Sequence, residues 1–277
     1  MSSVIEDVKN TGLIINSQYE DITSENYDRL FFATNEKLNE LFSYVDIRGK
    51  KILSVVGSGD QIFHLYNMGA KKVDLFDINK LSFYYFYLRL WNMIYMNGYY
   101  IPVYFDNSYI EELLKKVSPQ CTKEKEALQY WKMLINSYSL NYESLFFRTN
   151  MCNCENNQLS DFSKAVDSII TGDFNFYNID ITKDINIDEK YDIIVVSNIS
   201  DWIECLCGNM RMYKYNLFNL LKYNGCVLSS NVNFSTIKEI ERKLFRQCFD
   251  IIEFSKDENS SYYDFPAGYV YKKIYRC

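Results

Sequence analysis

The sequence is poor in the residues that mark linkers and histidine-based catalysis. It contains three prolines, ten glycines and one histidine among 277 residues. With so few residues that break regular structure, no flexible interdomain linker is indicated, and we expect one globular core with elaborations. His64 is the only histidine, so a mechanism with a histidine base depends on it. A packed or surface position for this side chain is favoured instead.

Long apolar runs and clusters of basic residues are also missing. The apolar segments 52–56 and 193–196 are as long as strands, and fall short of the roughly 20 residues that cross a bilayer. Lysine and arginine number 30 against 36 aspartates and glutamates, a net charge of −6. We therefore expect no integral membrane segment and no nucleic-acid partner, because nucleic-acid binding needs clustered cations. The first ten residues lack the apolar region of a secretory signal, so the expected location is the cytoplasm.

Eight cysteines are present, but their spacing is irregular. Two close pairs, Cys152 with Cys154 and Cys205 with Cys207, do not have the spacing of zinc ribbons, and the chain has no second histidine. A disulfide framework is typical of shorter secreted chains. We expect free thiols in a reducing compartment and no metal site.

Hydrophobic periodicity divides the chain into an N-terminal helical cap at 1–49 and an α/β domain at 50–277. Within the cap, apolar residues recur at helical spacing from Asn16 to Tyr44. From residue 50 onward strands and helices alternate, which predicts a doubly wound, mainly parallel α/β sheet. The expected strands are 52–56, 73–76, 173–179, 192–197, 225–230, 249–254 and 270–275, with helices at 79–96 and 235–247. A helical insertion at about 105–164 could form a substrate lid.

A glycine turn follows the first expected strand. The strand ends in Val55-Val56-Gly57-Ser58-Gly59-Asp60-Gln61, and Asp77 ends the next strand twenty residues after Gly57. Glycines let a backbone approach a ligand, and a carboxylate at the second strand end accepts hydrogen bonds from ribose hydroxyls. This combination favours an adenosine cofactor over an ordinary tight turn.

The residues around the turn favour one adenosine cofactor. A dinucleotide site would have a third glycine where Ile62 stands, and bare helix N–H groups facing a pyrophosphate. Asp60 adds a negative charge beside the place of that pyrophosphate, an arrangement that suits a cationic ligand. S-adenosylmethionine has no phosphate and carries an ammonium and a sulfonium. We therefore expect S-adenosylmethionine and not NAD or FAD.

Three segments carry a resemblance to a known family: Gly57 to Gln61, Phe76-Asp77-Ile78-Asn79, and Ser197-Asn198-Ile199-Ser200-Asp201. The chain from about Tyr27 to Ser230 resembles the class I S-adenosylmethionine-dependent transferases. More specifically it resembles the branch related to the 3-amino-3-carboxypropyl transferase of betaine-lipid synthesis. The usual methyltransferase turn has an acid at the position of Val55 and a glycine at that of Gln61, and both departures agree with this branch. The resemblance implies a class I methyltransferase-like Rossmann fold.

The resemblance also implies which residues bind the cofactor. The turn would face the methionyl portion, the second strand end would hold the ribose with Ile78 on adenine, and the fourth strand end would lie under the sulfonium. An adenine-edge acceptor would come from the segment that contains Asp180. The implied cofactor-binding residues are Gly57, Ser58, Gly59, Asp60, Gln61, Asp77, Ile78, Asn79, Asp180, Ile181, Ser197 and Asn198.

Acceptor-side residues follow less directly. Tyr27, Asn35, Glu36 and Ser200 are the candidate substrate-binding residues, and Ser200 with Asp201 could instead cap a helix. Tyr19 and Asp201 are the candidate catalytic residues, because a tyrosine before the sheet could stack on the sulfonium as a cation–π partner or orient the acceptor. The dense aromatic residues of 81–100 either pack the core or line a pocket for an apolar acceptor.

A sulfonium has three activated carbons, and cofactor-binding motifs do not settle which one is attacked. The first hypothesis is transfer of the 3-amino-3-carboxypropyl group to a small-molecule acceptor. The second is methyl transfer at the same site. A third is a catalytically silent module that binds the cofactor for sensing or assembly.

Overall fold

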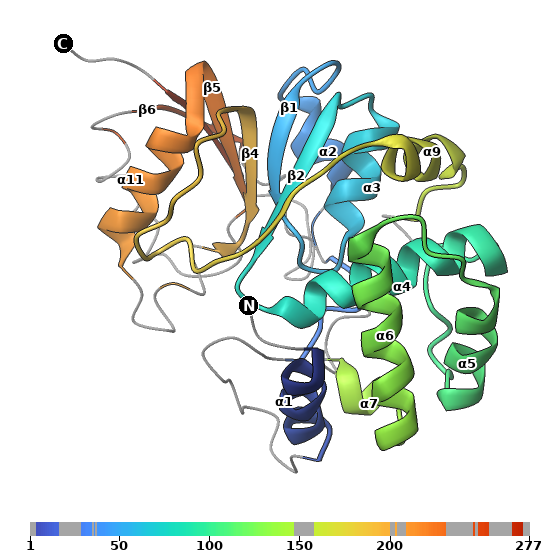
Figure 1. The fold of residues 1–277 in the computed structure, drawn as a ribbon. Coiled ribbons are helices and arrows are strands. Elements are labelled where there is room, and N and C mark those ends of the chain that lie inside the picture. The colour runs from blue at the N-terminus through green and yellow to red at the C-terminus, as the bar shows by residue number, and fades with distance from the viewer. Residues whose placement is uncertain are drawn as a thin grey trace, which may run out of the picture. The chain divides into compact units, whose positions relative to one another are not determined.

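The computed structural model describes residues 4–16, 29–34, 36, 38–146, 158–199, 203, 209–230, 246, 249–254 and 268–273. The helices are α1 (Val4–Asn16), α2 (Leu38–Ser43), α3 (Asp60–Asn67), α4 (Lys80–Met96), α5 (Asn107–Lys116), α6 (Thr122–Ser137), α7 (Tyr142–Leu145), α9 (Ser163–Thr171) and α11 (Met210–Leu220). The strands are β1 (Lys51–Val55), β2 (Lys72–Asp77), β3 (Phe176–Asn178), β4 (Tyr191–Ser197), β5 (Leu221–Ser230), β6 (Phe249–Phe254) and β7 (Gly268–Lys273). Figure 1 labels most of them.

The chain forms two compact units. The first comprises Met1–Thr34, Val56–Phe63 and Asp77–Ile170, and the second comprises Asn35–Val55, His64–Phe76 and Thr171–Cys277. We call them the helical unit and the sheet unit. The helical unit contains α1 and α4 to α7, and the sheet unit contains nearly all of the β-structure.

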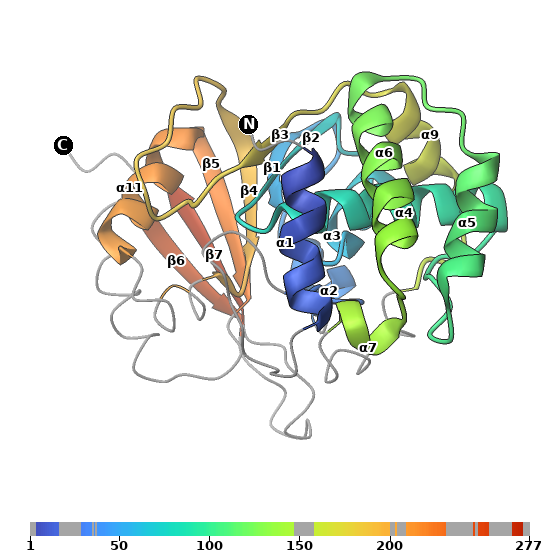
Figure 2. The same cartoon turned by 60° about the horizontal axis from the view of Figure 1, so that its bottom comes forward.

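The sheet has seven strands in the order β3-β2-β1-β4-β5-β7-β6 (Figure 2). β1 pairs in parallel with β2 and β4, and β4 pairs in parallel with β5. β7 runs antiparallel to both β5 and β6. The mainly parallel α/β sheet predicted from the sequence is confirmed, and its parallel strands end at one edge, where cofactors bind in such folds.

Both faces of the central strands are buried, which explains why the sequence shows continuous apolar runs there and no alternation. Consecutive residues of β1, Ile52 and Leu53, and of β4, Ile194 and Val195, are all fully buried. On one face, apolar side chains of β1, β4 and β5 pack with Tyr213, Leu217 and Leu220 of α11. This core holds the strands that lead to the candidate site.

In the helical unit, α4 lies buried among α1, α5 and α6 (Figures 1 and 2). The rings of Tyr84 on α4 and Tyr130 on α6 stack with centroids 3.8 Å apart, and the indole N–H of Trp131 donates to the Tyr84 carbonyl at 2.8 Å. Tyr130 and Trp131 are fully buried. The helices predicted for the insertion are present as α5 to α7, and α6 packs into the core of its unit; the substrate-lid role of the insertion stays a prediction. The aromatic residues of α4 pack this core.

The predicted N-terminal helix differs from the observed structure. The first helix, α1, ends at Asn16, and of the predicted helix only α2 is found among the described residues. Leu30 instead forms a β-bridge with Phe146, and its N–H donates to the Leu145 carbonyl at 2.8 Å. Leu30 is buried and paired through these tertiary contacts, so its helical spacing to Leu38 and Leu41 does not report one continuous helix. Residues 17–28 lie outside the described part.

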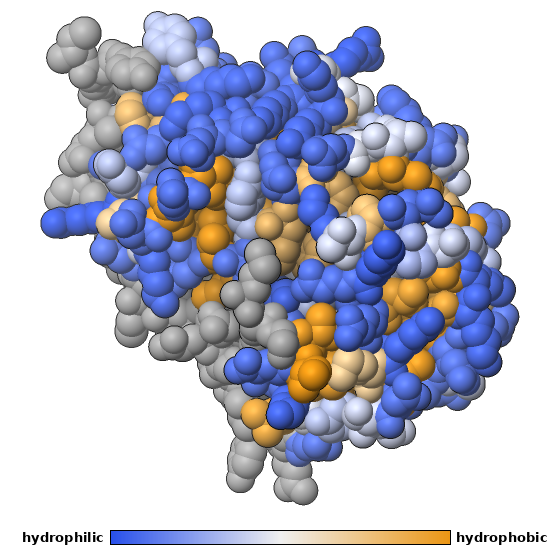
Figure 3. Space-filling view, in the orientation of Figure 1, coloured by the Kyte–Doolittle hydropathy of each residue, from blue (hydrophilic) through white to orange (hydrophobic). Residues whose placement is uncertain are grey.

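Other boundaries shift by a few residues. β3 covers 176–178 where 173–179 was expected, and β7 covers 268–273 where 270–275 was expected. The helix expected at 235–247 falls almost wholly outside the described residues. None of the described helices has the length and apolar character needed to cross a membrane, and the face drawn in Figure 3 is mostly hydrophilic with apolar patches.

Candidate functional site

The glycine turn follows directly after β1 in the chain. Gly57 and Gly59 adopt φ angles of +50° and +88°, the left-handed region that costs other residues energy. A Cβ atom built on Gly57 meets no atom within 4 Å. Glycine is therefore favoured here by the φ angle and not by crowding, and there is room beside the backbone. The Gly59 N–H donates to the Val56 carbonyl at 2.7 Å, which closes the turn just before α3 begins.

Asp77, the last residue of β2, is bound to this turn. Its Oδ2 accepts a hydrogen bond from the Gly57 N–H at 3.0 Å, and its Oδ1 accepts one from the Asn79 N–H at 2.9 Å. Burial raises the pKa of Asp77 to about 6, although these hydrogen bonds oppose the rise. Ile78 is half-buried beside it, and Asn79 caps α4 by accepting from the Leu81 N–H at 3.0 Å. The structure thus brings together the predicted turn and the predicted ribose carboxylate.

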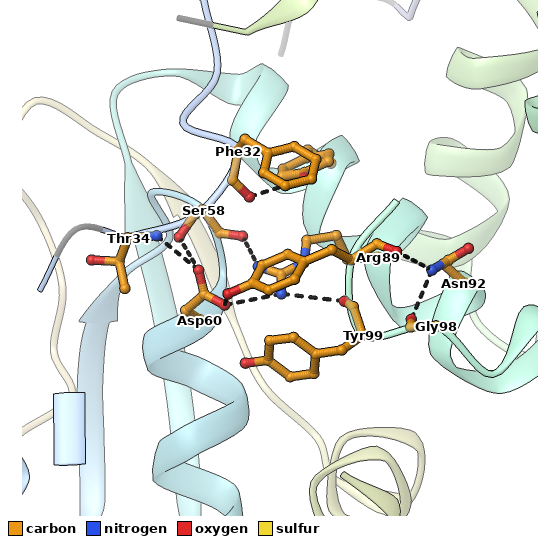
Figure 4. Close-up of polar contacts among 10 residues, drawn as sticks. Phe32, Thr34, Ser58, Asp60, Arg89, Asn92, Gly98 and Tyr99 are labelled. Atoms are coloured by element: carbon orange, nitrogen blue, oxygen red, sulfur yellow. Dashed lines mark hydrogen bonds and ion pairs between the residues drawn. The ribbon is translucent and has the colours of Figure 1, made fainter. Parts of the chain in front are cut away.

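Asp60 is held by the protein itself. It is fully buried and forms an ion pair with the equally buried Arg89, with Nη2 and Oδ1 2.9 Å apart (Figure 4). Its other oxygen accepts from the Thr34 N–H at 2.9 Å and from the Ser58 hydroxyl at 2.7 Å, and the Tyr100 hydroxyl donates to Oδ1 at 3.1 Å. The expectation that Asp60 offers a free negative charge to a cationic cofactor is therefore wrong, because Arg89 neutralises that charge inside the fold.

Arg89 is a residue that the sequence analysis missed. Its Nη1 donates to the Ser58 carbonyl at 2.6 Å, and its guanidinium lies 5.1, 5.0 and 4.6 Å from the ring centroids of Phe63, Tyr99 and Tyr100. Burial alone would lower the pKa of Arg89, but the Asp60 carboxylate reverses this and raises it. Arg89 is the only charged residue from Leu81 to Met96. A lone charge in an apolar helix implies a buried counter-charge, and that signal was available.

The N-terminus of α3 offers little to a pyrophosphate. The N–H groups of Ile62 and Phe63 both point to the Gly59 carbonyl, at 3.1 and 3.4 Å. Ile62 is buried, and the Asp60 carboxylate occupies the first turn of the helix. The Phe63 bond is the first regular bond of the helix, whereas the Ile62 N–H is one that a helix start usually leaves free, so one of the N–H groups that would bind a phosphate is already engaged.

In the sheet unit, Glu36 lies against the ends of β4 and β5. Its Oε1 accepts from the Ser197 hydroxyl at 2.6 Å and from the Ser230 hydroxyl, and the Glu36 side chain is almost completely buried. Ser197 adopts a φ of +53°, an uncommon left-handed conformation for a serine, and its carbonyl accepts from the Ser229 hydroxyl at 3.3 Å. The structure thus unites two predicted residues from distant parts of the sequence, Glu36 and Ser197.

Asp180 and Ile181 have local roles. The Asp180 carboxylate accepts from the Thr182 N–H at 2.9 Å and its hydroxyl at 2.7 Å. The Ile181 side chain packs in the core of the sheet unit, and its carbonyl accepts from the Asn216 side chain at 2.8 Å. Their contacts with adenine, and those of Gln61 and Asn198 with the cofactor, stay predictions.

Several predicted residues lie outside the described part of the chain: Tyr19, Tyr27, Asn35, Ser200, Asp201 and the two cysteine pairs. His64 is buried in α3, in agreement with the packed interpretation. Within the described ranges, no three histidine, cysteine, aspartate or glutamate side chains gather closely enough to hold a metal ion.

No protein-family model and no curated protein matches the chain. Solved structures of similar fold include the N-methyltransferase NodS from Bradyrhizobium japonicum in complex with S-adenosyl-L-homocysteine (10% identity, 96% of this chain and 98% of that one, TM-score 0.44). A methyltransferase from Pyrococcus furiosus (8%, 97% and 97%, 0.46) and the ribosomal protein L11 methylase from Lactobacillus delbrueckii (11%, 86% and 77%, 0.42) are also similar.

Proposed function

We propose that this protein binds S-adenosylmethionine and transfers a group from it to a small-molecule acceptor. The observation that best supports this proposal is the hydrogen bond that the Gly57 N–H donates to the Asp77 carboxylate. It joins a left-handed glycine turn to an acid at the end of the neighbouring parallel strand. That pair of features is what an adenosine ligand needs: open backbone for close approach and an acceptor for the two ribose hydroxyls.

The adenosine portion has a natural orientation on these residues. With its ribose on Asp77, the adenine would lie against the half-buried Ile78, which follows directly in the chain. The space beside Gly57, where a Cβ would meet nothing, would admit the part of the ligand that continues from the ribose. The Ile62 N–H at the start of α3, already engaged by the Gly59 carbonyl, favours a ligand without a pyrophosphate.

For the transferred group, we favour 3-amino-3-carboxypropyl. Support comes from the Gly-Ser-Gly-Asp-Gln turn, which resembles that of the betaine-lipid branch. The acceptor's lone pair would form a bond to the aminocarboxypropyl carbon next to sulfur as the carbon–sulfur bond breaks. The bonding electrons pass to the sulfur, which leaves as neutral methylthioadenosine, and the acceptor loses its proton. The protein's part is to position the reactants and exclude water.

Mass spectrometry of the products tests this proposal. The protein would be incubated with S-adenosylmethionine and a deproteinised cell extract as the source of acceptors. Methylthioadenosine together with an acceptor enlarged by the aminocarboxypropyl group is the expected result. Adenosylhomocysteine would instead identify a methyltransferase, and an unchanged cofactor would favour the silent binding module. Because S-adenosylmethionine releases methylthioadenosine spontaneously, incubations without protein and with Asp77→Ala set the background. The cytoplasmic location stays a prediction.

A further inference from the structure

We propose that the buried pair Asp60–Arg89 is a positioning device: it holds the glycine turn in the conformation that binds the cofactor, without touching the cofactor itself. The inference rests on the proposed function and deepens it. Asp60 was expected from the resemblance to face the methionyl portion, and the structure gives both of its oxygens other partners.

The pair contacts the turn on both sides of Ser58. Arg89 donates to the Ser58 carbonyl, and Asp60 accepts from the Ser58 hydroxyl. Arg89 therefore holds the main chain of Ser58 and Asp60 holds its side chain, and the two residues are bound to each other. Its neighbours Gly57 and Gly59 are the two left-handed positions of the turn. A Cβ atom at Gly59 would lie 3.5 Å from the rings of Phe63 and Phe86, an ordinary contact, so it is the φ angle of Gly59 that favours glycine there.

The contacts that hold Ser58 also influence Asp77, the carboxylate expected to bind the ribose, because only Gly57 lies between them. Gly57 precedes Ser58, and its N–H donates to Asp77. If Ser58 moves, the direction of the Gly57 N–H and the orientation of Asp77 change with it. Four segments meet at the pair: the turn, α4, Thr34, and Tyr99-Tyr100. The Tyr99 carbonyl accepts from Arg89, and the Thr34 N–H and the Tyr100 hydroxyl donate to Asp60. Figure 4 shows Thr34, Ser58 and Arg89 around the Asp60 carboxylate, with the Tyr99 carbonyl at Arg89.

Fold stability alone is a weak reason for such a pair. Removing two charges from water costs energy that their attraction only partly repays, and apolar residues at the same positions are often as stable or more so. What an ion pair adds is a fixed direction, since the guanidinium presents donors in a rigid fork. Here one Nη group is directed at a carbonyl of the turn and the other at the carboxylate.

The test compares the full-length protein with a charge-neutral double variant, Asp60→Asn/Arg89→Met, and with the conservative Arg89→Lys. Asp7→Asn is the matched control. Asp7 is also fully buried in the helical unit, and it binds a cation and a phenol, Lys80 at 2.7 Å and Tyr84 at 2.6 Å. For each protein, thermal unfolding, the Kd for S-adenosylmethionine by calorimetry, and hydrogen exchange of peptides covering residues 56–63 without ligand would be measured.

We expect the double variant to bind S-adenosylmethionine about tenfold more weakly, corresponding to a coupling near 1.4 kcal/mol. Exchange at residues 56–63 should rise in it, and Arg89→Lys should be intermediate in both measurements. Asp7→Asn should lose stability and keep its Kd and its exchange at the turn. An unchanged Kd and exchange in the double variant would overturn the inference, as would an equal loss of affinity in Asp7→Asn. If the double variant does not fold, Arg89→Lys decides by the same two measurements.

Failure of the proposed function gives a different result. In that case the unaltered protein does not bind S-adenosylmethionine, and the exchange data alone show whether the pair orders the turn. Binding by the unaltered protein, with identical binding by every variant, would reject the positioning role and leave the proposed function intact.

Discussion

The N–H of Gly57 donates a hydrogen bond to Oδ2 of Asp77 at 3.0 Å, across twenty residues of sequence. It fixes the glycine turn against the end of the second strand. The second oxygen of Asp77 accepts from the Asn79 N–H at the start of α4. The ends of a turn, a strand and a helix are therefore joined at one carboxylate.

Replacing Asp77 with alanine should weaken S-adenosylmethionine binding. The carboxylate would accept hydrogen bonds from the ribose, and a hydrogen bond to a charged group is worth about 1.5 to 3 kcal/mol. The Kd should therefore rise by at least about tenfold, as measured by calorimetry. Asp106→Ala, at an exposed helix cap, is the control and should leave the Kd unchanged. An unaltered Kd in Asp77→Ala would place the ribose elsewhere.

The pKa of Asp77, raised by burial to about 6, gives affinity and stability opposite pH dependences. Binding of methylthioadenosine, which lacks the amino-acid portion, should tighten as the pH rises through 6 and the carboxylate ionises. Because the folded protein holds the Asp77 proton more tightly than the unfolded chain, this group stabilises the fold. The stabilisation is complete at a pH below the unfolded pKa of 3.8, and it is lost as the pH rises through the folded pKa of about 6. Both effects should disappear in Asp77→Asn. Affinity that does not change between pH 5 and 7, in both proteins, would contradict this prediction.

Changing Glu36 to glutamine should affect turnover more than cofactor binding. Glu36 is bound by the hydroxyls of Ser197 and Ser230, and the sequence predicts it to contact the acceptor. Glutamine keeps an oxygen for these hydroxyls and removes the charge. We expect kcat to fall by about tenfold or more, with the Kd for S-adenosylmethionine within about twofold. Glu40→Gln, four residues further on in α2, is the control. A loss confined to the Kd would assign Glu36 to the cofactor instead.

Truncating Trp131 should destabilise the protein. This side chain is fully buried and bonded to the Tyr84 carbonyl, so Trp131→Ala should cost about 3 to 5 kcal/mol in the free energy of unfolding. Tyr104→Ala, at a side chain that is 99% exposed, should change it by less than about 0.5 kcal/mol. Chemical denaturation measures both. A Trp131→Ala protein of unchanged stability would contradict the assignment of α6 to the core of its unit.

The parts of the site that could be predicted from the sequence are those encoded locally. Gly57 and Asp77 lie at the ends of two short apolar runs at a spacing set by the connecting helix, so their meeting follows from parallel pairing. The centre of the sheet could be predicted for the same reason, since β1 and β4 contain continuous apolar segments.

The pair Asp60–Arg89 could not be placed in this way, because its members are 29 residues apart and their contact depends on how α4 packs. Asp60 alone suggested a free charge, and only the buried partner shows that it is neutralised. Leu30 misled in the opposite direction: its spacing to Leu38 and Leu41 fits a helix, but it is buried and forms a β-bridge with Phe146. Tertiary packing decides both cases.

Calorimetric titration of the purified protein with S-adenosylmethionine and, separately, with NAD tests the central claim most directly. The glycine turn bound to Asp77, and the Ile62 N–H that is engaged by the Gly59 carbonyl, predict saturable binding of S-adenosylmethionine and none of NAD. Tight binding of NAD with no response to S-adenosylmethionine would contradict the account.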